Sequence, residues 1–157
     1  MFRSLKINRL RVATAILGMG MVGSVVAQSL PNVRVWKDPN CGCCKEWITH
    51  MQRAGFSVTT MDVGNASARA RLGMPADKGS CHTAQVGQYV IEGHVPAADV
   101  KRLLKEKPQA VGLAAPGMPI GSPGMDSPVY GGRAQAYDVL LVRKDGSSSV
   151  FQAHPGR

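Results

Sequence analysis

The sequence lacks a run of basic residues and has few aromatic residues, which make up 5% of its 157 positions. Four of the 19 Lys and Arg lie within the first 27 residues, which leaves 15 scattered among 10 Asp and Glu. Nucleic-acid-binding domains usually carry clustered Lys and Arg, with aromatic side chains on which bases stack. Because both features are missing, we expect no nucleic-acid partner and interpret the charges as solvated surface.

The sequence also lacks an apolar segment long enough to span a membrane. Residues 12–26 are apolar but count only 15 positions, with three glycines among them, whereas a membrane-spanning helix needs roughly 20 residues. Four basic residues precede this segment, and Val25, Val26 and Ala27 stand before Gln28. The pattern is typical of a secretory signal peptide over residues 1–27, with a membrane anchor as the alternative. Cleavage would leave residues 28–157 as one exported domain without stable membrane insertion.

Cysteine is scarce, yet three of the four cysteines fall within four positions, as Cys41, Cys43 and Cys44; the fourth is Cys81. Export implies an oxidising compartment, where four cysteines would by default form two structural disulfides. The α-carbons of adjacent residues are about 3.8 Å apart, below the roughly 4.4 to 6.8 Å that an unstrained disulfide prefers. The cysteine crowding therefore indicates sulfur chemistry rather than two ordinary disulfides.

The apolar periodicity predicts an α/β chain. Apolar positions from Cys44 to Met51 recur at helical spacing, which places Cys44 on the buried face of a helix that ends at Gly55. Residues 33–36 precede this helix as a strand, and residues 56–63 follow it as a parallel strand. Further predicted elements are helices over 66–72 and 96–107, a third strand over 85–92, a loop over 112–132, and a C-terminal hairpin of 137–143 and 149–153 on either side of Asp145-Gly146. We expect an α/β sandwich with a mixed sheet and an extra helix after the third strand.

The segment Cys41-Gly42-Cys43-Cys44-Lys45 resembles the active-site turn of thioredoxins, C-G-P-C-K, with Cys43 in place of the proline. The resemblance implies a thioredoxin-like fold. In that family a cis-proline loop faces the dithiol just before the third strand, and here residues 80–83, Ser-Cys-His-Thr, hold that position. The resemblance thus implies that Cys81 lies beside the cysteine turn. Two departures are the absence of proline from this loop and the helix over 96–107, which would interrupt strands that thioredoxins join directly.

Four segments together resemble the CopG family, formerly a domain of unknown function. They are residues 41–44 (CGCC), 81–84 (CHTA), 89–97 (YVIEGHVPA) and 117–125 (GMPIGSPGM). That family is thioredoxin-like, is exported to the periplasm of Gram-negative bacteria, is associated with copper-resistance gene clusters, and binds copper through its cysteines. The resemblance implies a periplasmic copper-binding protein of copper resistance, whose partners are copper ions and other periplasmic copper-resistance proteins.

The cysteines suit Cu(I), a soft ion that prefers thiolate and thioether ligands. We expect Cys41, Cys43, Cys44 and Cys81 to bind it, with the helix N-terminus and Lys45 lowering the cysteine pKa values. Four thiolates carry more charge than a single Cu(I) neutralises, which suggests that the reduced protein holds more than one copper ion. A further hypothesis is that the cysteines act as an electron reservoir that cycles copper between Cu(I) and Cu(II).

Other side chains are additional candidate ligands. His82 adjoins Cys81 and offers an imidazole, while Met118 and Met125 offer thioethers from the expected loop. The alternatives are a hydrogen-bonding role for His82 and simple packing for the methionines. We assign His94 a structural role, and His50 and His154 to the surface.

Two other functions also fit the cysteines. A thiol–disulfide oxidoreductase would use Cys41 to attack and Cys44 to resolve, although the chain has two thiols more than such a pair needs. A closed tetrahedral zinc site is another alternative, but structural zinc usually takes cysteines from paired knuckles rather than from a single turn. The copper interpretation uses all four cysteines.

Overall fold

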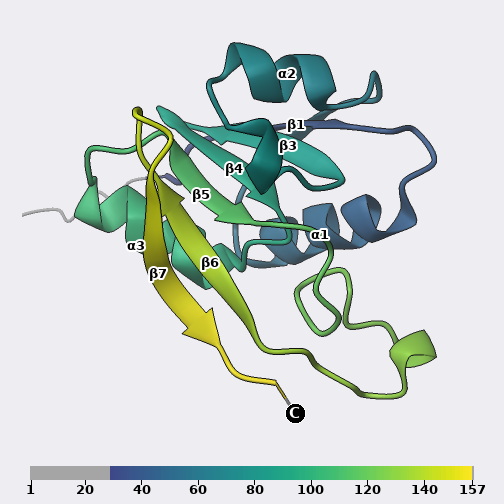
Figure 1. The fold of residues 1–157 in the computed structure, drawn as a ribbon. Helices are drawn as coiled ribbons and strands as arrows, with labels where there is room; N and C mark the ends of the chain where they lie inside the picture. Colours follow the sequence, from purple (N-terminus) through teal and green to yellow (C-terminus); the bar gives the residue numbers. More distant parts are fainter. Residues whose placement is uncertain (1–28, 157) are drawn as a thin grey trace, which may run out of the picture.

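The computed structural model describes residues 29–156, so the signal peptide expected over residues 1–27 lies outside the described residues. The strands are β1 (Val33–Lys37), β2 (Val58–Met61), β3 (His82–Val86), β4 (Tyr89–Gly93), β5 (Gly112–Ala115), β6 (Tyr137–Val142) and β7 (Ser148–His154). The helices are α1 (Gly42–Arg53), α2 (Ala66–Arg71) and α3 (Ala97–Glu106), with single 3-10 turns at Ala76–Lys78 and Pro128–Tyr130. The strands form one seven-stranded sheet in the order β2-β1-β3-β4-β5-β6-β7 (Figure 1). The sheet pairs both parallel and antiparallel strands, which confirms the expected α/β class with a mixed sheet.

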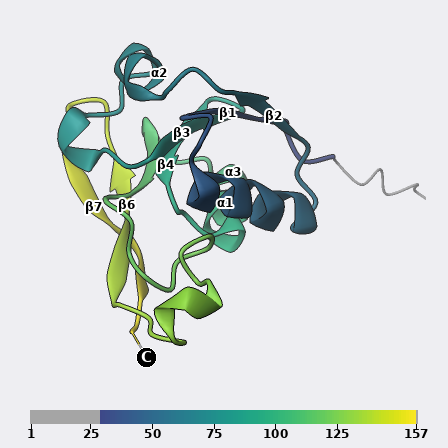
Figure 2. The same cartoon turned by 90° about the vertical axis from the view of Figure 1, so that its right-hand side faces the viewer.

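Helices α1 and α3 cover one face of the sheet, and α2 covers the other (Figures 1 and 2). Three side chains of α1, Cys44, Trp47 and Met51, are fully buried, as their spacing of three and four residues requires. Trp47 and Met51 pack with strand residues such as Val35 and Ile91 in the main core. Burying a large apolar side chain contributes about 1.5 to 3 kcal/mol, so this face holds α1 firmly against the sheet. Among residues 29–156, no helix is long and apolar enough to cross a membrane.

The segment expected to be a single third strand is two strands. β3 and β4 form an antiparallel hairpin in which Val86 pairs with Tyr89. Gly87 sits at the turn with φ of 58°, a left-handed conformation that glycine adopts without steric cost. The prediction was wrong because apolar residues continue on both sides of this two-residue turn. α3 therefore follows a fourth strand, and the expected interruption between the two strands is absent.

The loop expected over residues 112–132 begins later, because its first residues form β5. This strand is buried along its whole length and pairs in parallel with β4. Gly112 is required there, since a Cβ atom at this position would lie 1.7 Å from the carbonyl oxygen of Val90. Its sequence, Gly-Leu-Ala-Ala, has no β-branched residue, so strand propensity alone does not reveal it. The connecting loop runs over residues 116–136.

The expected C-terminal hairpin is present as β6 and β7, which pair antiparallel. α3 anchors its outer strand at two points. The Asp99 carboxylate lies 2.7 Å from His154 Nε2, and the Arg102 guanidinium lies 3.8 Å from the centroid of the Phe151 ring. His154 also stacks on Tyr137 with ring centroids 4.7 Å apart. The assignment of His154 to an ordinary surface position was therefore wrong.

Candidate metal centre

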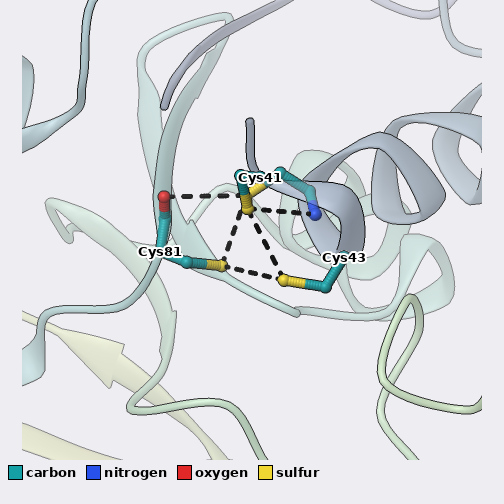
Figure 3. Close-up of side chains that lie close together, drawn as sticks. Cys41, Cys43 and Cys81 are labelled. Atoms are coloured by element: carbon teal, nitrogen blue, oxygen red, sulfur yellow. Dashed lines mark hydrogen bonds between the residues drawn. A yellow bond between two sulfur atoms is a disulfide. The ribbon is translucent and has the colours of Figure 1, made fainter. Parts of the chain in front are cut away.

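The four cysteines meet at the N-terminus of α1. Cys41 is the N-cap of this helix, and its sulfur accepts a hydrogen bond from the Cys44 backbone N–H at 3.3 Å. Cys43 and Cys44 lie in the first turn, and Cys81 approaches from the segment just before β3. All four sulfur atoms lie within 4.8 Å of one another. The structure thus brings together four cysteines that come from two distant parts of the chain, and Figure 3 labels three of them, Cys41, Cys43 and Cys81.

The contacts in this cluster link every cysteine to at least one other. Cys41 and Cys44 are joined as a disulfide, with their α-carbons 5.4 Å apart, while Cys43 and Cys81 are free thiols. The Cys43 sulfur lies 3.5 Å from that of Cys41 and 3.8 Å from that of Cys81. The Cys81 sulfur lies 3.4 Å from that of Cys44. In this form two sulfurs are free to bind a metal ion, and reduction of the disulfide would supply two more.

The environment of Cys81 raises its pKa instead of lowering it. Burial is the main cause, followed by repulsion from the neighbouring Cys43, and together they raise the pKa of the Cys81 thiol to about 12. The general expectation of lowered cysteine pKa values was therefore wrong for this residue. A metal cation would have to displace the proton from Cys81 in order to bind it.

His94 is a candidate ligand that the sequence analysis placed among the structural residues. It is fully buried, and its Nε2 lies 3.0 Å from the Cys81 sulfur. Its Nδ1 lies 2.8 Å from the carbonyl oxygen of Pro123. Because a carbonyl only accepts, Nδ1 carries the proton and Nε2 presents its lone pair toward Cys81. Metal-binding histidines characteristically donate their second N–H in this way.

His82 lies in the same cluster, as the sequence analysis expected. Its side chain is fully buried, and its Nδ1 lies 3.4 Å from the Cys81 sulfur. Its ring also packs against Trp47, with centroids 4.4 Å apart, and its Nε2 has no hydrogen-bond partner. Cys81, His82 and His94 thus form a second group of possible metal ligands that shares Cys81 with the cysteine cluster. The signal that pointed to His94 was its place directly after the β4 segment, in one of the four blocks resembling CopG.

The loop over residues 116–136 packs against the N-terminus of α1. A Cβ atom on Gly124 would lie 2.6 Å from the Cys43 carbonyl oxygen and 2.9 Å from the Trp47 nitrogen, so only glycine permits this approach. Met125 follows directly and is 7% exposed, whereas Met118 is 53% exposed. Met118 follows Gly117, whose carbonyl accepts a hydrogen bond from the Ser80 hydroxyl. The loop therefore places both methionines next to residues that contact the cysteine segments.

His50 also has a structural contact that the sequence analysis missed. Its Nε2 accepts a hydrogen bond of 3.0 Å from the backbone N–H of Ala97, the first residue of α3. A helix N-terminus leaves its first N–H groups without partners inside the helix. His50 thus caps α3 from α1 and is only partly exposed, so its assignment to the open surface was wrong.

Because His82 and His94 are buried, we expect the metal-free protein to lose stability in mild acid. Burial lowers the pKa of both His82 and His94 below 6.5. Below that pH the unfolded chain binds protons that the folded protein does not. The contribution of the two histidines to the free energy of unfolding is therefore complete above about pH 6.5 and falls as the pH decreases below it. Each histidine contributes a slope of up to about 1.4 kcal/mol per pH unit. Urea unfolding between about pH 7.5 and 5.5 measures the slope.

The variant His82→Asn isolates the contribution of one histidine to this pH dependence. We expect its free energy of unfolding to fall less steeply with decreasing pH than that of the unchanged protein. Equal slopes for the two proteins would contradict the assignment of a buried, neutral His82.

Comparison with known proteins gives two kinds of match. A family described as a protein of unknown function, DUF411, matches residues 78–125. The solved structure named "Copper resistance protein copG- Form 1" is 45% identical, with a TM-score of 0.74, and the match covers 81% of this chain and 99% of that one. A second structure, "Copper resistance protein copG- Form 2", is 43% identical with the same TM-score and covers 80% and 99%. No curated protein sequence matches.

The fold and the cluster define an α/β protein with a candidate metal centre built from thiols and imidazoles. At 45% identity over 81% of its length to a solved copper resistance protein, the chain belongs to the CopG family. This confirms the family resemblance, and together with the cysteine cluster it supports a copper-related role. The likeness to thioredoxins stays a prediction, because both matching structures carry the CopG name.

Proposed function

We propose that this protein binds Cu(I) through Cys41, Cys43, Cys44 and Cys81. The observation that carries the proposal is the approach of all four sulfur atoms to within 4.8 Å of one another, with Cys81 reaching the α1 turn from a distant segment. A soft monovalent ion with two or three sulfur ligands fits such a cluster, whereas Mg²⁺ and Ca²⁺ prefer oxygen. The partly exposed positions of Cys41, Cys43 and Cys81 support access of an ion from solvent.

His94 and His82 complete the proposed ligand set on the inner side of Cys81. The lone pair of His94 Nε2 faces the sulfur, and the Pro123 carbonyl fixes the ring in that orientation. Imidazole nitrogen also suits Cu(II), which favours nitrogen donors. Met118 and Met125 are proposed as weak thioether ligands from the covering loop. This set has donors for more than one copper ion, and we propose that the reduced protein binds more than one.

The mixture of a disulfide and free thiols supports a redox step within the same site. Reducing the Cys41–Cys44 disulfide takes two electrons, which two Cu(I) ions supply when both are oxidised to Cu(II). The reverse step forms the disulfide and returns two Cu(I). We propose that the protein performs this chemistry or holds Cu(I) in the periplasm, after export by the segment over residues 1–27, together with other copper-resistance proteins.

Anaerobic titration of residues 28–157 with Cu(I) against a chromophoric chelator tests the proposal. We expect the fully reduced protein to take up more than one equivalent tightly, because four thiolates balance more than one positive charge. A second anaerobic sample starts from the disulfide form, and its thiols are counted before and after addition of Cu(I). A gain of two thiols in step with the formation of two Cu(II) would support the redox step. Saturation at one equivalent would contradict multiple binding, and weak uptake would contradict the copper site.

A second candidate function is thiol–disulfide exchange by Cys41 and Cys44. It is favoured by the observed disulfide between these residues at the N-terminus of α1, a position that stabilises a thiolate. Reduction of insulin by a dithiol in the presence of the protein measures this activity. Rapid insulin reduction together with weak Cu(I) binding would favour exchange over copper binding.

A further inference from the structure

The backbone of Ser80, the residue that precedes Cys81, is held by three side chains from other parts of the chain. The Ser80 backbone N–H donates to Glu92 Oε1 on β4 at 2.8 Å. The Ser80 carbonyl accepts from Arg69 Nη2 on α2 at 2.7 Å and from Asn65 Nδ2 at 3.0 Å. Both polar groups of Ser80 are therefore fixed, although this residue belongs to neither a helix nor a strand.

The two main clamping side chains are paired with each other in the interior. Arg69 Nε lies 2.9 Å from Glu92 Oε1, and the Glu92 side chain is 0% exposed. The second carboxylate oxygen, Oε2, accepts a hydrogen bond of 2.6 Å from Thr83 Oγ1 on β3. Glu92 thus bonds to the chain on both sides of Cys81, through Ser80 and Thr83.

The close packing of Gly93 reinforces this arrangement. A Cβ atom there would lie 2.5 Å from the Ser80 side chain and 2.7 Å from the Ala115 carbonyl oxygen. Ser80 is consequently pressed against the end of β4 while its hydroxyl donates to the Gly117 carbonyl. The segment carrying Cys81 has little freedom to move away from the cysteine turn.

A buried ion pair of this kind is a poor source of stability. Desolvation of the two charges offsets most of their attraction, and replacement by apolar side chains of similar volume is often neutral or stabilising. The pair does, however, impose one geometry on the groups bonded to it. Three of the four cysteines are fixed by the turn of α1 itself, whereas Cys81 depends on a separate segment for its position.

We propose that Arg69 and Glu92 are positioning residues that hold Cys81 against the cysteine turn, and so set the affinity of the site for Cu(I). This inference rests on the proposed copper function. Neither residue touches the sulfur atoms; both act through Ser80, and Glu92 also acts through Thr83. The role differs from simple support of the fold, because we expect its loss to weaken the metal site and to expose Cys81 in a protein that still folds.

The double variant Arg69→Met with Glu92→Leu tests the proposal. It removes both charges while keeping apolar side chains of similar length, so we expect cooperative unfolding, at a melting temperature lowered by the loss of the partners of the Ser80 N–H and the Thr83 hydroxyl. We expect Cu(I) affinity to fall at least about tenfold, in the range seen when groups that orient metal ligands are removed. In the metal-free reduced protein, we expect faster alkylation of Cys81, followed by mass spectrometry. Unchanged affinity and unchanged alkylation in a folded double variant would overturn the proposal.

Glu92→Gln is the second variant, for use where the double variant does not fold. Its amide oxygen still accepts from the Ser80 N–H, but the charge facing Arg69 is lost. We expect faster alkylation of Cys81 and a smaller loss of Cu(I) affinity than in the double variant. Lower stability with unchanged alkylation and affinity would show a purely structural role. Asp99→Asn is the matched control, because it changes a largely buried contact between a carboxylate and the His154 imidazole, at a position distant in sequence from Ser80, and should leave both readouts unchanged.

A double-mutant cycle with Cys81→Ser tests whether Arg69 and Glu92 act through Cys81 or support the whole site. If they act through Cys81, the double variant causes no further loss of Cu(I) affinity once Cys81 is replaced. A full additional loss would overturn the proposal. If Cys81→Ser by itself leaves Cu(I) affinity unchanged, the copper function assigned to Cys81 is wrong. The alkylation rate of Cys81 in the double variant then tests, without copper, whether Arg69 and Glu92 hold this residue in place.

Discussion

Replacing Cys81 with serine is expected to lower the affinity of the reduced protein for Cu(I) by at least about tenfold, or about 1.4 kcal/mol. The reason is geometric: the Cys81 sulfur lies 3.8 Å from that of Cys43 and 3.4 Å from that of Cys44, so it closes the cluster opposite α1. Serine keeps the shape of the side chain but offers a hard oxygen, which Cu(I) binds poorly. The measurement is competition with a chromophoric Cu(I) chelator without oxygen.

Cys41→Ser is the comparison that makes this result informative. If the four cysteines form a copper site, both variants lose affinity for Cu(I). If Cys41 and Cys44 form an exchange pair, Cys81→Ser keeps full insulin reduction while Cys41→Ser abolishes it. Full exchange activity together with unchanged copper affinity in Cys81→Ser would contradict the proposed role of Cys81.

Replacing Gly124 with alanine is expected to destabilise the protein by about 2 to 4 kcal/mol and to weaken the proposed binding of Cu(I). Gly124 has φ of 87°, which is unfavourable for alanine, and the added methyl group would collide with the backbone atoms of Cys43 and Trp47. Neither contact is with a flexible side chain that can turn aside, so the loop must shift away. That shift breaks the bond from His94 Nδ1 to Pro123. Urea unfolding and Cu(I) competition measure the two effects.

Gly131→Ala is the matched control for backbone strain. Gly131 has φ of 63°, and no atom lies within 4 Å of a Cβ built on it. We expect this variant to lose only the strain component, about 1 to 2 kcal/mol, with unchanged Cu(I) affinity. Similar losses in both variants would show that the approach of Gly124 to α1 has no importance of its own.

The parts of the fold that could be predicted from the sequence are those with strong local patterns. The α1 periodicity placed Cys44 on the buried face, and the Asp145-Gly146 turn located the β6–β7 hairpin. The β3–β4 hairpin was missed because a two-residue turn interrupts an otherwise continuous apolar segment. β5 was missed because it owes its strand form to its neighbours in the sheet rather than to its own residues.

In the candidate site, too, the local parts could be predicted from the sequence and the long-range contacts could not. The cysteine turn is local and could be predicted from residue spacing, and the position of Cys81 beside it was implied by the resemblance to thioredoxins. His94 could not be placed beside Cys81 from spacing alone, because the two residues are joined by a hairpin whose turn went unrecognised. The Arg69–Glu92 pair has no sequence pattern, since α2 and β4 meet only in the folded protein.

Three of the four cysteines are close in sequence and the fourth is distant, and this limits how much copper binding can stabilise the folded protein. Cys41, Cys43 and Cys44 remain within four residues of one another in the unfolded chain, which therefore keeps part of its capacity to bind the ion. A ligand stabilises the native state only by the difference between its affinities for the native and unfolded chains. For the proposed ligand set, that difference comes from the groups that the fold adds to the cysteine turn, which are Cys81, the two histidines and the loop methionines. The gain in melting temperature on loading copper is then expected to report the contribution of these added groups rather than the total affinity.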